Sequence, residues 1–437
     1  MNYTECLAYL NDLGHELRGV KFDLEAIRRI TEALGHPEQR YPTAIVAGTN
    51  GKGSTSAMLA SVLDCAGYRT GLYTSPHLVS VNERIRVAGR AVSDEEFASA
   101  FTEVRDAVDR LVATGVLPHL PSFFEFLTAT AFLRFAAARV DFVVLEVGMG
   151  GRLDATNLTE PRVAVITNVE LDHTEFLGAT HAAIAFEKAG VIKPGRPVIS
   201  SCENPVAAEV IRRRAAELGA ELIDLPSYVA PGNLRDQAGR YAFDLALNGD
   251  RFPNLALPLA GKFQVKNAQA AVAAAWRLAR EGFHIPAEAI RAGVHETHWP
   301  GRLEIVGRRP LVLLDGAHNP AAAFEIARFI REELADKRLT LVYASMRDKA
   351  IGEISEILFP LAAEVYLTRV EQARAALPEE ILAAARHTPA RVVLEPHPVR
   401  ALERARQHAA PDDVVLVAGS LFLVGAIKQA LEQPASK

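Results

Sequence analysis

The sequence predicts an α/β protein: a P-loop domain with a doubly wound, mostly parallel sheet, followed by a smaller Rossmann-like C-terminal α/β domain. Short apolar runs alternate with amphipathic segments along most of the 437 residues, the pattern of parallel strands covered by helices on both faces. A chain of this length suggests two or three domains of roughly 100–200 residues each. A glycine-rich turn directly follows the first strong apolar run, as in phosphate-binding loops.

The larger sheet is expected in the first half of the chain. Its predicted strands are Ala44–Ala47, Thr70–Tyr73, Phe142–Leu145, Val163–Ile166 and Val198–Ser200. The helical patterns between them are Ser54–Ala66, Ser93–Ala113, Phe123–Arg139, Thr180–Val191 and Val206–Leu218. Ligands bind beyond the carboxyl ends of parallel strands, so Gly48, Glu146 and Thr167, which follow three of these strands, are expected to converge.

Residues 298–302, His-Trp-Pro-Gly-Arg, interrupt the pattern with Pro and Gly, and we place the domain boundary just before them. The predicted domains are residues 1–297 and 298–437. Residues 220–258 indicate broken strands and turns at the edge of the first domain. The elements expected after them are helices Asn267–Arg280 and Pro286–Gly293, then strand Leu311–Leu314, helix Ala321–Leu334, and strands Leu339–Ala344, Val365–Leu367, Val392–Leu394 and Val414–Val417.

Composition and charge narrow the class of protein. The formal net charge is −5 and the basic residues form no runs, so we expect no nucleic-acid partner. Cys6, Cys65 and Cys202 lack CxxC spacing, which favours a reducing compartment and argues against structural zinc. No stretch approaches the roughly 18 apolar residues of a membrane helix, and the first residues lack the apolar core of a signal peptide. We expect a soluble cytoplasmic protein with no membrane partner.

The segment Gly48–Ser54, Gly-Thr-Asn-Gly-Lys-Gly-Ser, has the features of a phosphate-binding loop. Glycines let the backbone approach phosphates, and the free N–H groups and the helix N-terminus supply positive potential. Lys52 adds a charge, and a hydroxyl can meet a metal ion. The spacing differs from GxxxxGK[ST] because Gly53 separates the lysine from Ser54. The alternative is a chance Gly/Lys/Ser turn.

Two further strand ends in the first domain carry polar residues. Glu146 follows four apolar residues, where a charge is expensive unless it has a function, and Mg²⁺ takes one or two carboxylates with phosphate oxygens and water. An ordinary loop glutamate is the alternative. His173 follows another strand and can ligate a second cation as neutral imidazole or be a satisfied polar side chain. Nothing in its surroundings distinguishes Lys188, near a helix C-terminus, from a solvated cation.

The second domain repeats this arrangement after its first strand. Asp315 and His318 lie in the turn Asp315–Pro320, which can bind a ribose, an ammonium group or a phosphate, or can serve only the turn. Arg302 lies in the hinge, where it can reach a nucleotide across a cleft. Polar strand ends that face each other suggest that ATP is held between two domains that close.

Taken together, these motifs resemble one family, the folylpolyglutamate synthases/dihydrofolate synthases of the Mur ligase superfamily, whose ATP-dependent amide ligases carry this variant of the phosphate loop. The resemblance runs along nearly the whole chain. It rests on ten segments in order: Gly48–Ser54, Thr74–Leu78, Ser122–Phe126, Glu146–Asn157, Leu171–Thr174, Glu187–Gly190, Pro300–Arg302, Asp315–Pro320, Met346–Lys349 and Val417–Ser420.

The resemblance implies a role for individual residues. The residues implied to bind ATP are Gly51, Lys52, Gly53, Ser54, Asn267, Arg302 and Asp315. Those implied to hold Mg²⁺, with two ions expected, are Ser75, Glu146 and His173. The implied catalytic residues are Lys52, Lys188, which would be carbamylated by CO₂, and His318, at the glutamate end. The residues implied to bind the acceptor are Lys21, Phe22, Asp23, Leu24, Ser122, Phe123, Phe124, Glu125, Leu153, Asp154 and Ala155.

The implied reaction is ATP-dependent ligation of L-glutamate to a folate or dihydropteroate carboxylate through an acyl phosphate. ATP, L-glutamate and the acceptor would be the only partners of a monomer. One alternative is a ligase acting on a cell-wall precursor, although the aromatic segment Phe123–Phe126 favours a flat pterin. Another is a P-loop ATPase or regulator without ligase activity, which the turn with Asp315 and His318 disfavours.

Overall fold

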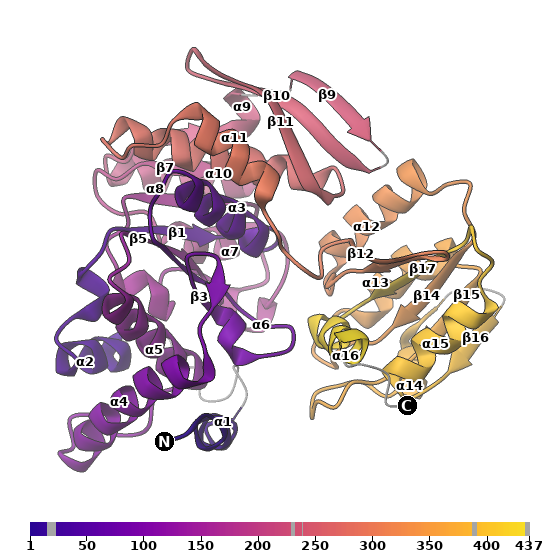
Figure 1. Cartoon of the computed structure of the whole chain (residues 1–437), viewed down its shortest axis with the longest axis horizontal. Coiled ribbons are helices and arrows are strands. Elements are labelled where there is room, and N and C mark those ends of the chain that lie inside the picture. The colour runs from indigo at the N-terminus through magenta and orange to yellow at the C-terminus, as the bar shows by residue number, and fades with distance from the viewer. Residues whose placement is uncertain (15–22, 229–231, 238, 387–390, 433–437) are drawn as a thin grey trace.

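The computed structural model describes residues 1–14, 23–228, 232–237, 239–386 and 391–432, which form three sheets (Figure 1). The largest sheet has eight strands in the order β4-β3-β2-β5-β1-β6-β7-β8. Strands β2, β5, β1, β6, β7 and β8 are parallel to one another. At the other edge of the sheet, β3 pairs antiparallel with β2, and β4 pairs antiparallel with β3. Their bounds are β1 (Thr43–Ala47), β2 (Thr70–Tyr73), β3 (Ile85–Val87), β4 (Arg90–Ala91), β5 (Phe142–Glu146), β6 (Val163–Ile166), β7 (Val198–Ser200) and β8 (Leu222–Asp224).

Helices cover both faces of this sheet because side chains alternate along each strand. On β1, Ile45 and Ala47 belong to one apolar core, and Ala44 and Val46 belong to the other. The first core includes helices α1 (Tyr3–Asp12), α2 (Glu25–Ala33), α4 (Asp94–Ala113), α5 (Phe123–Ala138), α6 (Thr174–Leu177), α7 (His181–Ala189) and α8 (Pro205–Glu217). The second includes α3 (Lys52–Cys65), α9 (Leu225–Tyr228), α10 (Phe263–Arg280) and α11 (Ala287–Glu296).

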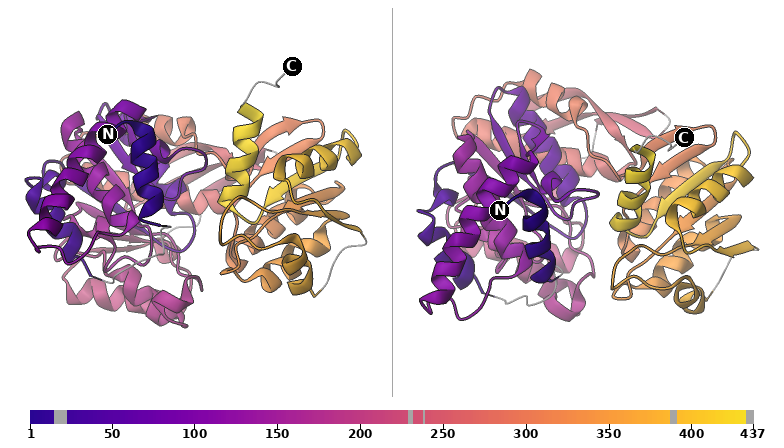
Figure 2. Two further views of the ribbon diagram at one scale, coloured as in Figure 1. Left: turned by 90° about the horizontal axis from the view of Figure 1, so that it is seen from below. Right: turned by 60° about the horizontal axis from the view of Figure 1, so that its bottom comes forward.

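A three-stranded antiparallel sheet packs on the second core. It has the order β11-β10-β9, with β9 (Gly232–Gln237), β10 (Arg240–Leu247) and β11 (Asp250–Ala260). Figures 1 and 2 show this sheet extending from the N-terminal half toward the C-terminal domain. There the Tyr241 hydroxyl donates to Glu333, the last residue of helix α12 (Pro320–Glu333) in the C-terminal domain, at 2.6 Å. The pairing of β10 with both neighbours contains register shifts, in line with the broken strands and turns predicted for this part of the chain.

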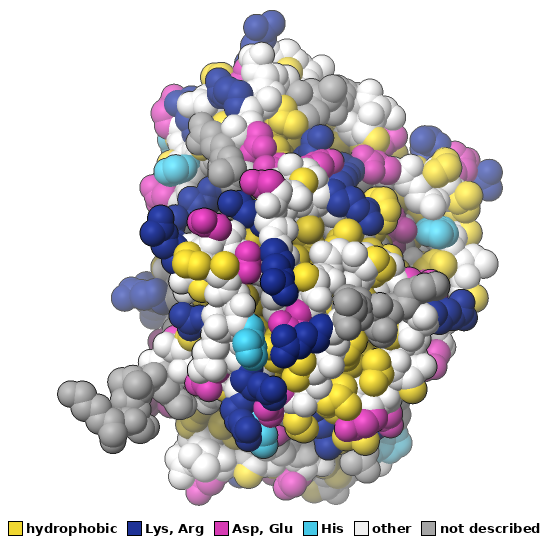
Figure 3. All heavy atoms as spheres, turned by 90° about the vertical axis from the view of Figure 1, so that its right-hand side faces the viewer, with side chains coloured by type: hydrophobic (Ala, Val, Ile, Leu, Met, Phe, Trp, Pro, Cys, Tyr) yellow, Lys and Arg dark blue, Asp and Glu magenta, His cyan; other side chains and the backbone are white. Residues whose placement is uncertain are grey.

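The C-terminal sheet has six strands in the order β12-β13-β17-β14-β15-β16, all parallel except β12. They are β12 (Glu304–Arg308), β13 (Leu311–Leu314), β14 (Leu339–Tyr343), β15 (Glu364–Leu367), β16 (Arg391–Leu394) and β17 (Val414–Ala418). One face is covered by α12 (Pro320–Glu333), α13 (Ile351–Leu358) and α14 (Pro378–Ala384), and the other by α15 (Pro398–His408) and α16 (Leu421–Glu432). On the side of this domain seen in Figure 3, acidic and basic side chains are mixed rather than segregated.

The predicted fold class is confirmed, and the differences from the predicted elements are local. Helix α3 begins at Lys52 rather than Ser54, because Gly51, at φ 84°, ends the loop directly before it. Helix α10 begins at Phe263, so Asn267 lies within it rather than at its start. The boundary at residues 297/298 falls between α11 and β12 and stays a prediction. Within the described residues, no helix is both long and apolar enough to span a membrane.

Candidate active site

The carboxyl ends of β1, β5 and β6 lie side by side in the centre of the larger sheet. Val46 pairs with Glu146, and Ala47 pairs with Ile166. The residues expected to converge from their positions in the sequence are therefore neighbours. A cavity of about 420 Å³ opens beyond these strand ends, and residues of both the N-terminal and C-terminal domains line it.

The phosphate-binding loop needs its glycines because other groups approach them closely. Gly51 has a φ of 84° and precedes α3. A Cβ added there would lie 2.2 Å from Asn267 Oδ1, and one added at Gly48 would lie 1.9 Å from Thr167 Oγ1. The loop therefore packs tightly against β6 and α10, and the N-terminus of α3 lies at the cavity. This is the arrangement that binds phosphate at a helix N-terminus.

Two lysines meet at one carbonyl of this loop. Lys52 Nζ donates to the carbonyl oxygens of Gly48 and Thr49, each at 3.0 Å, and Lys188 Nζ donates to that of Gly48 at 2.8 Å. Burial lowers the pKa of Lys52, and burial together with the charge of Lys52 lowers the pKa of Lys188 to about 7. The charges of Asp172 and Asp154 act on both lysines but do not offset the effect of burial. Two lysine amines at the end of the cavity favour a polyanion such as a nucleotide phosphate chain.

Ser75, Glu146 and His173, the residues predicted to bind a metal, all line the cavity. The backbone N–H of Ser75 donates to Glu146 Oε2 at 3.1 Å. Burial raises the pKa of Glu146 to about 7, although the charge of Lys52 opposes this. Burial lowers the pKa of His173 to about 4, so its imidazole is neutral near pH 7, as a metal ligand must be. Their role as metal ligands stays a prediction.

The C-terminal domain contributes a second polar edge, at the end of β13. Asp315 accepts the backbone N–H groups of Leu303 and Ala317, each at 2.8 Å. Burial raises the pKa of Asp315, and the charge of Arg302 opposes this. His318 Nδ1 lies 2.8 Å from the carbonyl oxygen of Gly316, which can only accept. Burial lowers the pKa of His318 to about 4, so its ring is neutral near pH 7 and Nε2 carries a free lone pair.

Most of the residues predicted to bind the acceptor line the same cavity, namely Asp23, Ser122, Phe124, Glu125, Leu153, Asp154 and Ala155. Leu24 is not among the lining residues, and neither is Phe123, whose ring lies 5.4 Å below the guanidinium of Arg84. Lys21 and Phe22 fall outside the described residues. Ser122 and Glu125 also cap α5, and the Ser122 hydroxyl donates to Glu125 at 2.7 Å.

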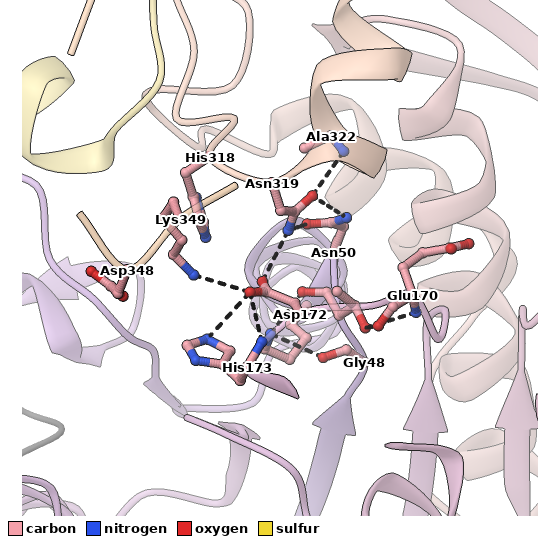
Figure 4. Close-up of polar contacts among 12 residues, drawn as sticks. Gly48, Asn50, Glu170, Asp172, His173, His318, Asn319, Ala322, Asp348 and Lys349 are labelled. Carbon is pink, nitrogen blue, oxygen red and sulfur yellow. Dashed lines mark hydrogen bonds and ion pairs between the residues drawn. The ribbon is translucent and has the colours of Figure 1, made fainter. Parts of the chain in front are cut away.

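Sequence reasoning missed several polar residues of the site, shown in Figure 4 with their neighbours. Lys349 Nζ lies 3.0 Å from Asp172 Oδ1, which joins the C-terminal domain to the loop after β6. Asn319 accepts the N–H of Ala322 as the N-cap of α12, and its amide reaches Asn50 and Asp172. An Asn directly before a Pro at a helix start predicts the cap, but nothing local predicts its partners in the other domain.

Comparisons with known proteins agree with this geometry. Residues 110–275 match the Mur ligase middle domain, and residues 301–421 match the Mur ligase glutamate ligase domain. The chain is 35% identical to the dihydrofolate synthase/folylpolyglutamate synthase of Bacillus subtilis, over 95% of this chain and 96% of that protein.

Two solved structures extend the agreement to three dimensions. A Mycobacterium tuberculosis folylpolyglutamate synthase complexed with ADP has a TM-score of 0.92 and 32% identity, with 99% of each chain covered. E. coli FolC in complex with DHPP and ADP has a TM-score of 0.87 and 32% identity, over 99% of this chain and 98% of that one. The chain belongs to the dihydrofolate synthase/folylpolyglutamate synthase family of the Mur ligases.

Proposed function

We propose that this protein joins L-glutamate to the carboxylate of a folate or a dihydropteroate, with ATP as the energy source. The observation that carries this is a single cavity with the phosphate-binding loop on one side and the turn containing Asp315 and His318 on the other. The relatives named above have this activity in their names, and solved relatives hold ADP, or ADP with DHPP.

The edge of the larger sheet fits a magnesium–nucleotide complex. Among the described residues, no group of three or more His, Cys, Asp and Glu side chains could hold a metal ion by itself. Of Ser75, Glu146 and His173, only the last two are of these types, and such a sparse set suits Mg²⁺ because it keeps water and phosphate oxygens in its shell. We propose that they hold Mg²⁺, with two ions in the complete site. Bound Mg²⁺ would neutralise charge on the transferring phosphoryl group.

A carboxylate is a poor electrophile, so the acceptor must first be activated. An oxygen of its carboxylate attacks the γ-phosphorus of ATP, the bond to ADP breaks, and an acyl phosphate forms. Lys52 and the N–H groups at the start of α3 stabilise the charge on the transferring group. We assign Gly51, Gly53 and Ser54 to the same phosphates. Further ATP contacts come from Asn267, Arg302 and Asp315.

The amine of L-glutamate then attacks the carbonyl carbon of the acyl phosphate. The nitrogen loses a proton, phosphate leaves from the tetrahedral intermediate, and an amide remains. His318 is neutral with a free Nε2, so it can take that proton.

We also propose that CO₂ carbamylates Lys188. The ammonium of Lys188 first loses one proton, and the neutral amine then adds to CO₂ and releases a second proton. A cation thus becomes an anion that can support the second magnesium site. A pKa of about 7 leaves much of this amine unprotonated at neutral pH. With ¹³C-bicarbonate, the protein should show a carbamate resonance that is missing from Lys188→Arg. An unmodified Lys188 under saturating bicarbonate would reject the modification and leave the ligase reaction untouched.

The acceptor is proposed to lie along the wall formed by α5 and the loop after β5. Phe124 presents an aromatic ring there, and a Cβ added at Gly148 would lie 2.6 Å from Phe124 Cζ. Leu153, Asp154 and Ala155 follow along the same wall. We further propose that the protein acts as a cytoplasmic monomer whose two domains meet at residues 297/298.

Phosphate release from MgATP and L-glutamate tests the proposal, with dihydropteroate and tetrahydrofolate compared as acceptors and products identified by mass. Turnover with both acceptors would establish a bifunctional enzyme, and turnover with tetrahydrofolate alone a chain-extending synthase. Phosphate release that does not depend on glutamate would indicate an ATPase. No turnover with either acceptor would overturn the proposed acceptors and favour a cell-wall precursor.

A further inference from the structure

Two asparagine side chains pair across the cleft between the domains (Figure 4). Asn319 Nδ2 donates to Asn50 Oδ1 at 2.9 Å, and Asn50 Nδ2 donates to Asn319 Oδ1 at 3.2 Å. Asn319 Nδ2 also donates to Asp172 Oδ2 at 3.0 Å, and its Oδ1 accepts the N–H of Ala322 at 2.9 Å. The carboxamide of Asn319 thus makes the four hydrogen bonds that it can make, in a residue that is 2% exposed.

Asn50 is held at the same time by its own domain. Its backbone N–H donates to Asn168 Oδ1 at 2.8 Å, and its carbonyl oxygen accepts the Thr167 hydroxyl at 2.6 Å. Its side chain pairs with Asn319, and the next two residues are Gly51 and Lys52. The orientation of this part of the phosphate-binding loop is therefore shared between the two domains.

We propose that Asn319 is a positioning residue, whose carboxamide holds the phosphate-binding loop through Asn50 when the domains close. Asp172, bound by both Asn319 and Lys349, fixes the neighbouring loop in the same way. Closure then aligns Lys52 for phosphoryl transfer. The expected effect on phosphoryl transfer rests on the proposed function, whereas the positioning of the loop by Asn319 does not.

The simpler role for Asn319 is the N-cap of α12, and Asn319→Ser separates the two. Serine is as good an N-cap as asparagine but cannot span the cleft to Asn50. If capping is the only role, Asn319→Ser behaves as the wild type. If the pair positions the loop, Asn319→Ser and Asn50→Ala each lower kcat, and Asn50→Ala leaves the cap intact.

A double-mutant cycle on kcat for glutamate-dependent phosphate release measures the coupling between Asn50 and Asn319. Each single variant is expected to lower kcat about tenfold, and the double variant also about tenfold, because residues in contact are coupled. Tyr241→Phe is the matched control, since it removes a 2.6 Å hydrogen bond between the domains far along the chain from the loop. The decreases in kcat caused by Tyr241→Phe and by Asn319→Ser should multiply when the two substitutions are combined. A double variant that falls about a hundredfold would overturn the coupling.

Amide hydrogen exchange supplies a readout that does not depend on catalysis. With Mg²⁺ and a nonhydrolysable ATP analogue present, peptides covering residues 49–55 should exchange faster in Asn319→Ser, in Asn50→Ala and in the double variant, to the same extent. Unchanged protection in Asn319→Ser would overturn the proposal. If the wild type does not use glutamate, the proposed function fails, and the exchange result still decides whether Asn319 holds the loop.

Discussion

The two sheets present their carboxyl ends to one cavity but hold their charged residues differently. At the larger sheet, Glu146 accepts one backbone N–H, Lys188 donates to one carbonyl, and burial brings the pKa of each to about 7. At the smaller sheet, Asp315 accepts two backbone N–H groups and lies near the charge of Arg302. Burial raises the pKa of Asp315 as well, so the two edges differ in hydrogen bonding: the carboxylate of the first edge has one backbone donor and that of the second has two.

This difference separates a carboxylate with few hydrogen bonds from the protein from one that also stabilises a turn. Buried charges with few protein partners cost stability until a metal ion or a phosphate chain compensates them. Buried charges with backbone partners stabilise a turn even without a ligand. Equivalent substitutions at the two edges should therefore change stability in opposite directions while both lower activity.

Removal of the cation in the phosphate-binding loop should have the largest effect. Lys52→Met takes away the ammonium that is proposed to stabilise the transferring phosphoryl group, so kcat should fall about 10³-fold or more. Glutamate-dependent phosphate release measures this. Lys337→Met, at a side chain 3.9 Å from Asp336 in the C-terminal domain, is the control and should keep full activity. A Lys52→Met enzyme with a tenth of the wild-type rate would contradict the role of this edge.

Glu146→Gln should stabilise the metal-free protein at high pH. The pKa of Glu146 is raised by burial from 4.5 to about 7, so the folded state holds more protons between these values and its stability falls as pH rises. Glutamine does not ionise, so its burial has no such pH-dependent cost. Relative to the wild type, its free energy of unfolding should therefore increase by roughly 2–3 kcal/mol between about pH 5 and pH 8. Denaturant unfolding with a chelator measures this, and a pH-independent difference would argue against a buried carboxylate with a raised pKa.

Asp315→Asn should lower the stability of the protein, whereas Glu146→Gln raises it. The carboxylate accepts the N–H groups of Leu303 and Ala317, and an amide can accept only one of them while it points a donor at the other. The free energy of unfolding should fall by about 1–3 kcal/mol at neutral pH. The same unfolding experiment applies. A neutral or stabilising result would remove the distinction between the two edges.

A smaller effect is expected on the acceptor wall. Phe124→Leu removes an aromatic ring that lines the cavity, so the KM for the acceptor should rise about tenfold while the KM for ATP changes little. Steady-state kinetics with each substrate varied in turn measure this. Phe123→Leu should raise the acceptor KM less, because that ring lies under Arg84 and does not line the cavity. Equal effects would place both rings at the acceptor.

The fold and one side of the site could be predicted because their signals are local. An apolar run ending in a polar residue identifies a strand and its carboxyl end, so Gly48 and Glu146 could be placed at one edge. The β3–β4 hairpin could not, since β4 has only two residues and the segment mixes Arg with apolar residues. The contact between Asn50 and Asn319 joins positions 269 residues apart, and no periodicity connects them.

Transfer of ¹⁸O tests most directly whether the two edges act on one acceptor carboxylate. An acceptor labelled with ¹⁸O in the carboxylate that receives glutamate is converted with MgATP and L-glutamate, and the released phosphate is analysed by mass. Activation at the larger sheet followed by amine attack beside His318 predicts one ¹⁸O in each phosphate. Phosphate without ¹⁸O, formed together with the ligated product, would contradict the acyl-phosphate route and the division of labour between the two edges.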